Sequence, residues 1–347
     1  MQEKNPFMVT FSRQPVEYIK RDEQSRLIQS TFLGNPVTDQ IFLILGVRGT
    51  GKTVLLYQMA DFFEKGADWI VIRCTATGDI INFVAQSLIQ ESVSRKYNIS
   101  LSFSVPGVAQ INLNTASSND KLVIKQVLHG LAEKGKRVLI TIDEITNTPQ
   151  MQDFASLFQA LIGEHLPVYF LGTGLYENIM AFQNVSNLTF LYRAPKIELG
   201  PLDAAAMART YQKVLNVSTE RSAQMARITL GYSFAFQALG YLYWQAGNVK
   251  NLEDLMPDYD AMLAESVYGK LWVDMSDMDH QLCRVIADAK EHTVKEIRGD
   301  TDSNRFNQRR IRLKRQGVIN TGRRGKLTFA LPRFDEFIHN TAFLYED

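Results

Sequence analysis

The chain has 347 residues, 45% hydrophobic and 22% charged, which is ordinary for a globular protein of two or three domains. The net charge of +1 conceals an asymmetry. Residues 291–330 hold eleven lysines and arginines against four acidic residues, a net +7, which leaves −6 for the rest of the chain. The asymmetry predicts an anionic partner for the basic segment alone.

Composition also excludes several classes of protein. Cys74 and Cys283 give no disulfide framework and are expected to be buried, and five scattered histidines give no zinc spacing. The first residues lack the apolar core of a signal peptide, and no apolar run approaches the ~20 residues of a membrane helix. We therefore expect a cytoplasmic protein with no membrane partner.

Residues 16–32 are expected to form a helix, and a short apolar strand at 41–45 then runs into a glycine-rich turn. The turn reads GVRGTGKT, which fits the phosphate-binding P-loop motif G-x-x-x-x-G-K-[ST]. A strand before this motif and a helix after it are the context that the motif requires. The predicted nucleotide-binding residues are Gly46, Arg48, Gly49, Thr50, Gly51, Lys52, Thr53 and Val54.

The parts of this motif have separate roles. Glycines let successive backbone N–H groups curl round an anion, and the helix that begins near Gly51 directs its positive end at the same anion. Lys52 is expected to reach the β- and γ-phosphates of ATP or ADP. Thr53 is expected to hold Mg²⁺ through its hydroxyl.

The next segments alternate between helix and strand. The helix after the motif should bury Val54, Leu55, Met59 and Phe62, and a buried strand at 69–74 and a helix at 80–93 follow. Residues 99–114 alternate like a β-hairpin insert that either caps the core or contacts DNA or a neighbouring subunit. Residues 119–134 are predicted to be helical.

A second diagnostic stretch reads RVLITIDEI from Arg137 to Ile145. Its apolar strand, 138–142, delivers Asp143 and Glu144 at its end, which is the Walker B pattern. Asp143 would hold Mg²⁺ through its water shell, and Glu144 would orient and deprotonate the attacking water. The pair lies 91 residues after Lys52, which leaves room for the helix–strand units of a parallel sheet.

Two further candidates come from later strands. A helix at 154–163 and a buried strand at 167–171 lead to Thr173, which either senses the γ-phosphate or the attacking water, or caps the next helix. A last strand is predicted at 189–199. Arg193, just before it enters the core, is either an arginine finger for a neighbouring subunit or an ordinary surface arginine.

A helical region follows. Asp203 is the predicted N-cap of a helix whose residues Met207, Tyr211 and Leu215 recur at four-residue steps. Further helices are predicted near 218–229, 234–244 and 252–268. Together they would form a small lid over the nucleotide.

The last segment predicts a winged helix-turn-helix. Ser276 and Asp279 form a capping box with Met278, Leu282, Val285 and Ile286 on one apolar face. Thr293 and Ser303 begin two more helices, and a hairpin ends the motif. The module would bind duplex DNA, although such modules also dock proteins; the predicted contacts are Arg305, Arg309, Arg310, Arg312, Arg323, Arg324 and Lys326.

With these stretches in place, the chain resembles the AAA+ ATPases of the archaeal-ATPase and STAND-like group, relatives of the origin-recognition ATPases. The resemblance rests on the two Walker motifs and on looser stretches: FLGTG, LYRAPKIELGPL, GYSFAFQALG and KLTFALPRFDEFI. It implies a three-layer α/β P-loop fold at 1–200, a helical lid at 201–270 and a winged helix at 271–347.

Departures from the group are visible in the lid. The group often has Gly-Tyr-Pro where this chain has Gly231, Tyr232 and Ser233, and Phe234 and Phe236 lie where relatives carry a sensor arginine. The leading Gly-Arg-x-x-Glu pattern is also imperfect. We therefore carry two hypotheses, a Mg²⁺-dependent ATPase coupled to DNA and a slow nucleotide-gated switch that docks a protein partner. Either could form a homo-oligomer.

Overall fold

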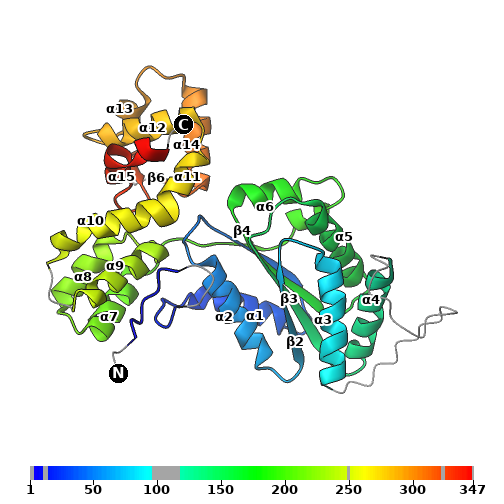
Figure 1. Ribbon diagram of the computed structural model, residues 1–347. Coiled ribbons are helices and arrows are strands. Elements are labelled where there is room, and N and C mark those ends of the chain that lie inside the picture. The colour runs from blue at the N-terminus through cyan, green and yellow to red at the C-terminus, as the bar shows by residue number, and fades with distance from the viewer. Residues whose placement is uncertain (1–3, 11–14, 96–117, 248–250, 322–324, 346–347) are drawn as a thin grey trace. The chain divides into compact units, whose positions relative to one another are not determined.

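The computed structural model describes residues 4–10, 15–95, 118–247, 251–321 and 325–345. They form two compact units, each built from separate stretches of chain (Figure 1). The sheet unit comprises Asp22–Leu45 and Lys52–Glu198, and the helical unit comprises Met1–Arg21, Gly46–Gly51 and Leu199–Asp347. The three-domain division predicted above stays a prediction, and the predicted insert at 99–114 lies outside the described residues.

The sheet unit is built on a five-stranded parallel sheet of order β2-β3-β4-β1-β5. β1 is wholly apolar, and the middle residues of β2, β3 and β4 are largely apolar, as expected for strands covered on both faces. In the sheet register Leu45 lies opposite Gly174 and Ile142 opposite Gly172, so β1, β3 and β4 end at the same edge. The strands are β1 (Ile41–Leu45), β2 (Trp69–Thr75), β3 (Arg137–Asp143), β4 (Val168–Gly174) and β5 (Lys196–Glu198).

Helices cover both faces of this sheet. On one face, Phe32 and Phe63 pack against Phe42, Trp69 and Tyr169. On the other face, the apolar sides of α3, α4 and α5 form a core with alternate strand residues. The helices of the unit are α1 (Asp22–Phe32), α2 (Lys52–Glu64), α3 (Ile80–Ser94), α4 (Ser118–Ala132), α5 (Pro149–Gly163) and α6 (Tyr176–Gln183).

Three predictions in this unit need correction. The leading helix begins at Asp22, not at residue 16. Phe62 is 41% exposed, and Phe63 takes the core position instead. The predicted strand at 189–199 is mostly wrong, because Thr189–Tyr192 (η1) is a 3-10 turn closed by the bond from the Arg193 N–H to the Phe190 carbonyl, and pairing with β1 leaves only three residues in β5.

The helical unit begins with a bundle, and the predicted helices and the Asp203 cap are confirmed (Figure 1). Phe7, from the start of the chain, packs on Gly240, where a Cβ would overlap its ring. Buried side chains then continue from the bundle into the winged helix as one core, which includes Cys283. The bundle consists of α7 (Ala204–Leu215), α8 (Thr219–Ile228), α9 (Ser233–Gln245), α10 (Leu252–Leu263), the π turn η2 (Ala264–Tyr268) and α11 (Gly269–Val273).

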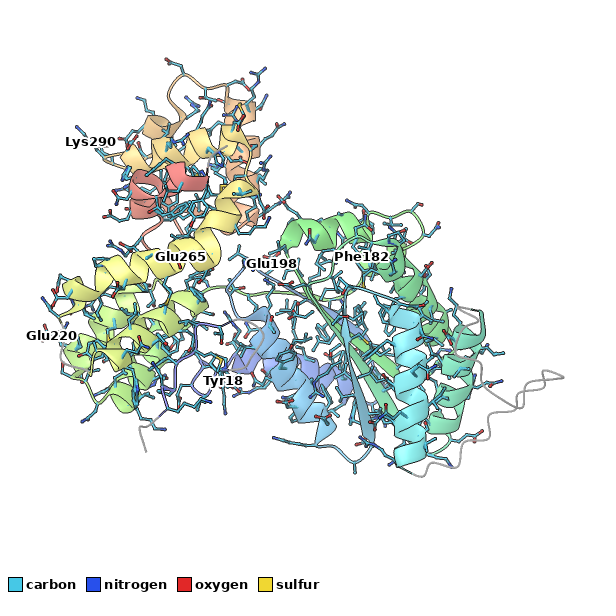
Figure 2. All side chains as sticks on the ribbon, viewed as in Figure 1. Tyr18, Phe182, Glu198, Glu220, Glu265 and Lys290 are labelled. Carbon is cyan, nitrogen blue, oxygen red and sulfur yellow. The ribbon has the colours of Figure 1, made fainter. Side chains whose placement is uncertain are left out.

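The winged helix is present, with its basic helix and an antiparallel hairpin of register Ile319↔Phe329. Figure 2 labels Glu265 on the π turn and Lys290 just after α12; the Lys290 N–H donates to Glu296. The sequence did not predict the two last elements. The module comprises α12 (Asp277–Asp288), α13 (Val294–Arg298), α14 (Ser303–Arg315), β6 (Ile319–Thr321), β7 (Leu327–Phe329), α15 (Phe334–Asn340) and the 3-10 turn η3 (Ala342–Tyr345).

The capping box at the start of α12 is confirmed and extends to α14. Asp279 is 1% exposed, accepts from the Ser276 backbone and also pairs with Arg312. Met278 and Val285, predicted on the apolar face, are 43% and 45% exposed, because only one side of α12 meets the core. Across the described residues, no helix is both long enough and apolar enough to span a membrane.

The first prediction concerns this ion pair. Arg312→Met should lower the free energy of unfolding by about 2 kcal/mol at neutral pH, because it leaves a buried carboxylate without its cation. Urea denaturation followed by circular dichroism measures the change. Arg305→Met, on the exposed surface of the same helix, should change it by about 0.5 kcal/mol or less. Equal losses in the two variants would contradict the structural role of Arg312.

Candidate functional site

The P-loop, residues 46–51, has the backbone that its glycines predict. Gly49 and Gly51 have φ angles of +77° and +89°, a region that other residues adopt with strain. A Cβ on Gly49 would also overlap the hydroxyl of Tyr232. The Thr50 hydroxyl donates to the Val47 carbonyl at 2.8 Å and tightens the turn. Glycine is therefore required at position 49 both by backbone conformation and by close contact.

The chain leaves the P-loop directly into α2, whose first residues are Lys52 and Thr53. Lys52 is only 9% exposed, which is unusual for a lysine. Val54 follows at a half-buried position. The unsatisfied N–H groups and the positive dipole end of α2 lie at the same residues, so this helix start favours an anion.

Three elements converge on the carboxylate of Asp143 at the end of β3. The Thr53 hydroxyl donates to Asp143 Oδ2 at 2.7 Å, and the Thr173 hydroxyl donates to Asp143 Oδ1. The backbone N–H of Glu144 is 3.1 Å from both Asp143 Oδ1 and the Thr173 hydroxyl. Thr173 is fully buried, so it fixes one carboxylate oxygen from within the sheet.

Glu144 occupies a strained position directly after this carboxylate. Its φ is +54°, in the left-handed region, and its side chain is exposed. The next residue, Ile145, returns to the sheet by donating its N–H to the Thr173 carbonyl at 2.7 Å. Backbone strain of this kind costs of order 1–3 kcal/mol and concentrates at functional sites, which supports a functional role for Glu144.

The oxygen atoms at Asp143 have the chemistry that Mg²⁺ prefers. A hydroxyl and a carboxylate from α2 and β3 lie together, and Mg²⁺ sites commonly use one or two such groups with waters and substrate phosphates. Among the described residues, no group of three His, Cys, Asp or Glu side chains forms a cage for a metal ion. Thr53 and Asp143 therefore fit a metal that arrives with a phosphate ligand.

The other two predicted site residues have different outcomes. Thr173 does not cap the following helix, because the N-cap of α6 is Leu175, so that interpretation was wrong. Its hydroxyl faces the carboxylate of Asp143 instead. Arg193 is exposed at the end of η1, outside any strand, and whether it acts as a finger stays a prediction.

The predicted DNA contacts on the winged helix differ in exposure. Arg305 and Lys326 are exposed, whereas Arg309 and Arg310 are half-buried on the flanks of α14. Arg312 donates to Asp279 and to the Ser276 hydroxyl, so its guanidinium is already engaged within the module. Arg323 and Arg324 lie outside the described residues.

Sequence reasoning missed three residues that bind the P-loop. Tyr232 donates from its hydroxyl to the Arg48 carbonyl, and both the Ser233 hydroxyl and the Arg21 guanidinium donate to the Thr50 carbonyl. Burial lowers the pKa of Arg21 to about 10, so it is still charged at neutral pH. The only signal was that these residues lie in motifs that depart from the group's pattern.

Comparisons with known proteins agree with this geometry. A family model described as an AAA domain matches residues 37–179, which hold the P-loop, Asp143 and Thr173. A second model, for a domain of unknown function (DUF8462), matches residues 265–338. No curated protein matches the chain.

Solved structures share the fold over nearly the whole chain. The Aeropyrum pernix ORC2 protein in its ADPNP–ADP complexes aligns over 97% of both chains, with 11% identity and a TM-score of 0.63. The ADP form of the A. pernix ORC2 protein aligns over the same shares, with 12% identity and a TM-score of 0.52. The combination of a parallel P-loop sheet, helical bundle and winged helix is therefore a known one.

The second prediction concerns Thr173. Thr173→Val keeps the shape but removes the hydroxyl that orients Asp143, so Mg²⁺-dependent nucleotide binding should weaken about threefold to tenfold. Calorimetric titration with ADP, in Mg²⁺ and in EDTA, measures it. Thr141→Val is the matched control, because Thr141 is equally buried in β3 but lies 3.5 Å from the Ile72 carbonyl. Indistinguishable affinities for the two variants would contradict the role of Thr173.

Proposed function

We propose that this chain is an origin-recognition-like AAA+ P-loop ATPase that binds and hydrolyses ATP in the cytoplasm, a proposal supported by the AAA domain matched at residues 37–179 and by the shared fold. We further propose that the state of the nucleotide controls a winged helix that binds duplex DNA. The A. pernix ORC2 structures were obtained with ADPNP and ADP, which supports an adenine nucleotide as the ligand.

The observation that carries the proposal is the convergence of hydroxyl groups on Asp143. Thr53, from the helix after the P-loop, reaches this carboxylate across the sheet from β1 to β3. In the proposed mechanism, Thr53 and Asp143 would hold Mg²⁺, and the ion would neutralise charge on the phosphate oxygens. This hydroxyl and this carboxylate, 2.7 Å apart, are oxygen ligands of the type that Mg²⁺ prefers.

The remaining residues act on phosphate and water. Lys52 would contact the β- and γ-phosphates, and Thr173 would keep the Asp143 carboxylate oriented. Glu144 would accept a proton from the water that attacks the γ-phosphorus, because its exposed carboxylate follows Asp143 directly. The positions of Arg48, Gly49, Thr50 and Gly51 would supply backbone contacts to the phosphates.

Arg193 is proposed to act on another subunit. Its exposed position at the end of η1 is the kind from which an arginine can reach a neighbouring molecule. An arginine finger supplied in trans stabilises charge in the transition state of phosphoryl transfer. The proposal therefore includes a homo-oligomer in the active state.

DNA binding is supported by charge and by shape. The +7 segment forms α13, α14 and the hairpin, and α14 would enter the major groove while the hairpin contacts backbone or minor groove. The proposed contacts include Arg305, Arg309, Arg310 and Lys326, together with Arg323 and Arg324, which lie outside the described residues. Arg312 would serve mainly to hold α14 on α12.

One contact within the helical unit supports the proposed coupling between nucleotide and winged helix. α14 ends at Arg315, and Gly317, two residues later, has a φ of +66°; a Cβ there would overlap the side chain of Val47 in the P-loop. The turn that follows the basic helix thus contacts the P-loop. A shift of the P-loop on nucleotide binding would therefore displace the turn that follows α14.

The third prediction separates binding from turnover. Lys52→Ala should abolish nucleotide binding at concentrations that saturate the parent protein, because it removes the charge that meets the phosphates. Glu144→Gln should bind ATP normally but lower turnover on the order of 100-fold. Fluorescence titration and phosphate release measure the two quantities. Turnover at the parent rate in Glu144→Gln would remove Glu144 from the mechanism.

The fourth prediction concerns DNA. Affinity for duplex DNA should fall steeply with salt, roughly a thousandfold between 50 and 200 mM if six phosphates are contacted. Arg305→Ala with Lys326→Ala should reduce the slope of log affinity against log salt by about 2, because each phosphate contact contributes about one unit. Fluorescence anisotropy with duplex DNA measures the slope.

The control for this experiment is Lys121→Ala on α4, an exposed lysine of the sheet unit, which should leave the slope unchanged. A parent protein that binds no duplex at low salt, and whose slow ATPase rate is unchanged by DNA, would contradict the proposal. That result would favour the alternative, a nucleotide-gated switch whose winged helix docks a protein.

A further inference from the structure

The P-loop is bound on its outer side by one short segment of the lid, Tyr232–Phe234, which we call the lid latch. Its three residues satisfy three successive P-loop carbonyls. The Tyr232 hydroxyl donates to Arg48 O, the Phe234 N–H donates to Gly49 O at 3.0 Å, and the Ser233 hydroxyl donates to Thr50 O at 2.8 Å. The three bonds thus join three neighbouring residues of the lid to three neighbouring carbonyls of the P-loop.

The latch is tightly packed against the P-loop. Tyr232 is 5% exposed and Phe234 is 6% exposed. A Cβ on Gly49 would overlap the Tyr232 ring and would lie 3.1 Å from the Phe234 Cβ. Burial raises the pKa of the Tyr232 hydroxyl, so it stays a protonated donor. Position 49 of the P-loop therefore has no room for a side chain.

Hydrogen bonds to the rest of the lid hold the latch and the residues on either side of it. The Tyr232 N–H donates to Thr229 O at 2.8 Å, and the Leu202 N–H donates to Gly231 O at 2.8 Å. Further along α9, the fully buried Tyr211 hydroxyl donates to Phe236 O at 2.7 Å. The start of α9 is thus hydrogen-bonded to the rest of the lid.

Peptide geometry gives this support a consequence for the opposite side of the P-loop. In a trans peptide the carbonyl and the following N–H point in opposite directions. When the carbonyls of Arg48, Gly49 and Thr50 face the latch, the N–H groups of Gly49, Thr50 and Gly51 face away from it; the Thr50 N–H also donates to the Val47 carbonyl at 3.4 Å. Successive N–H groups that face one side form the type of concavity that binds a phosphate.

We propose that Tyr232 and Ser233 are positioning residues for phosphate binding, which hold the P-loop in its anion-binding shape through its carbonyls. The inference rests on the proposed function, since it names how the same nucleotide site is kept in order. The inference assigns the positioning role to hydroxyl groups of the lid. A proline at position 233, as is common in the AAA+ group that the sequence resembles, could not make the bond from the Ser233 hydroxyl to the Thr50 carbonyl. By linkage, nucleotide binding then stabilises the latch by as much as the latch favours nucleotide.

The test uses two variants that each delete one hydroxyl from the full-length protein. Tyr232→Phe keeps the buried ring, and Ser233→Ala keeps the helix start. Each should weaken ADP·Mg²⁺ binding about threefold to tenfold and raise KM for ATP, with kcat changed less than twofold. Ser233→Thr restores a hydroxyl and should recover most of the affinity.

The matched control is Tyr211→Phe, which removes an equally buried lid hydroxyl whose acceptor is on α9 and not on the P-loop. It should lower the thermal midpoint of the nucleotide-free protein like Tyr232→Phe but leave the ADP affinity within twofold. The thermal midpoints also show that each variant is folded.

The outcomes separate this inference from the function on which it rests. A parent protein that binds no nucleotide removes the proposed function and the inference with it. A parent that binds ADP, with Tyr232→Phe and Ser233→Ala as little affected as Tyr211→Phe, leaves the proposed function intact and overturns the positioning role. A fall in kcat alone, at unchanged affinity, would also overturn it.

Discussion

The structure depends on the register of a parallel sheet, which brings the ends of β1, β3 and β4 to one edge. Strands that run in the same direction deliver their final residues together, so the residue after Ile142 meets the end of β4 without any special loop. Asp143 and Thr173 are brought together in this way, and Thr53 is added by the helix that returns from β1. The oxygen cluster is thus a direct result of topology, and its chemistry comes from only three side chains.

The P-loop is subject to a second constraint. Its residues 46–51 group with the helical unit, whereas Leu45 before it and Lys52 after it group with the sheet unit. Three of its carbonyls are bound by Tyr232, Ser233 and Phe234, and Val47 packs in the core that the bundle shares with the winged helix. The loop's shape is consequently held by residues about 180 positions away in the chain.

How much the sequence predicts depends on whether a feature is local. The P-loop, the end of β3, the caps at Asp203, Ser276 and Thr293 and the core strands were all predicted, because each is set by residues close in sequence. The prediction of a strand at 189–199 failed, because its apolar residues are equally compatible with a 3-10 turn. Only pairing with β1 decides the length of the strand. The outward positions of Phe62, Met278 and Val285 likewise depend on what packs beside the helix, which periodicity cannot supply.

The candidate site shows the same limit at the level of single hydroxyl groups. Thr173 was a candidate for two roles from sequence; the helix cap is rejected because α6 begins after Leu175, and the Thr173 hydroxyl donates to Asp143 across β3 and β4 instead. Ser233 was noticed as a missing proline, a loss of stiffness, yet the structure shows its hydroxyl bound to Thr50 O. A substitution that looks like a weakened turn in a linear motif can thus add a bond in three dimensions. Whether position 233 can bond the P-loop depends on the direction of one carbonyl, that of Thr50, which no sequence pattern encodes.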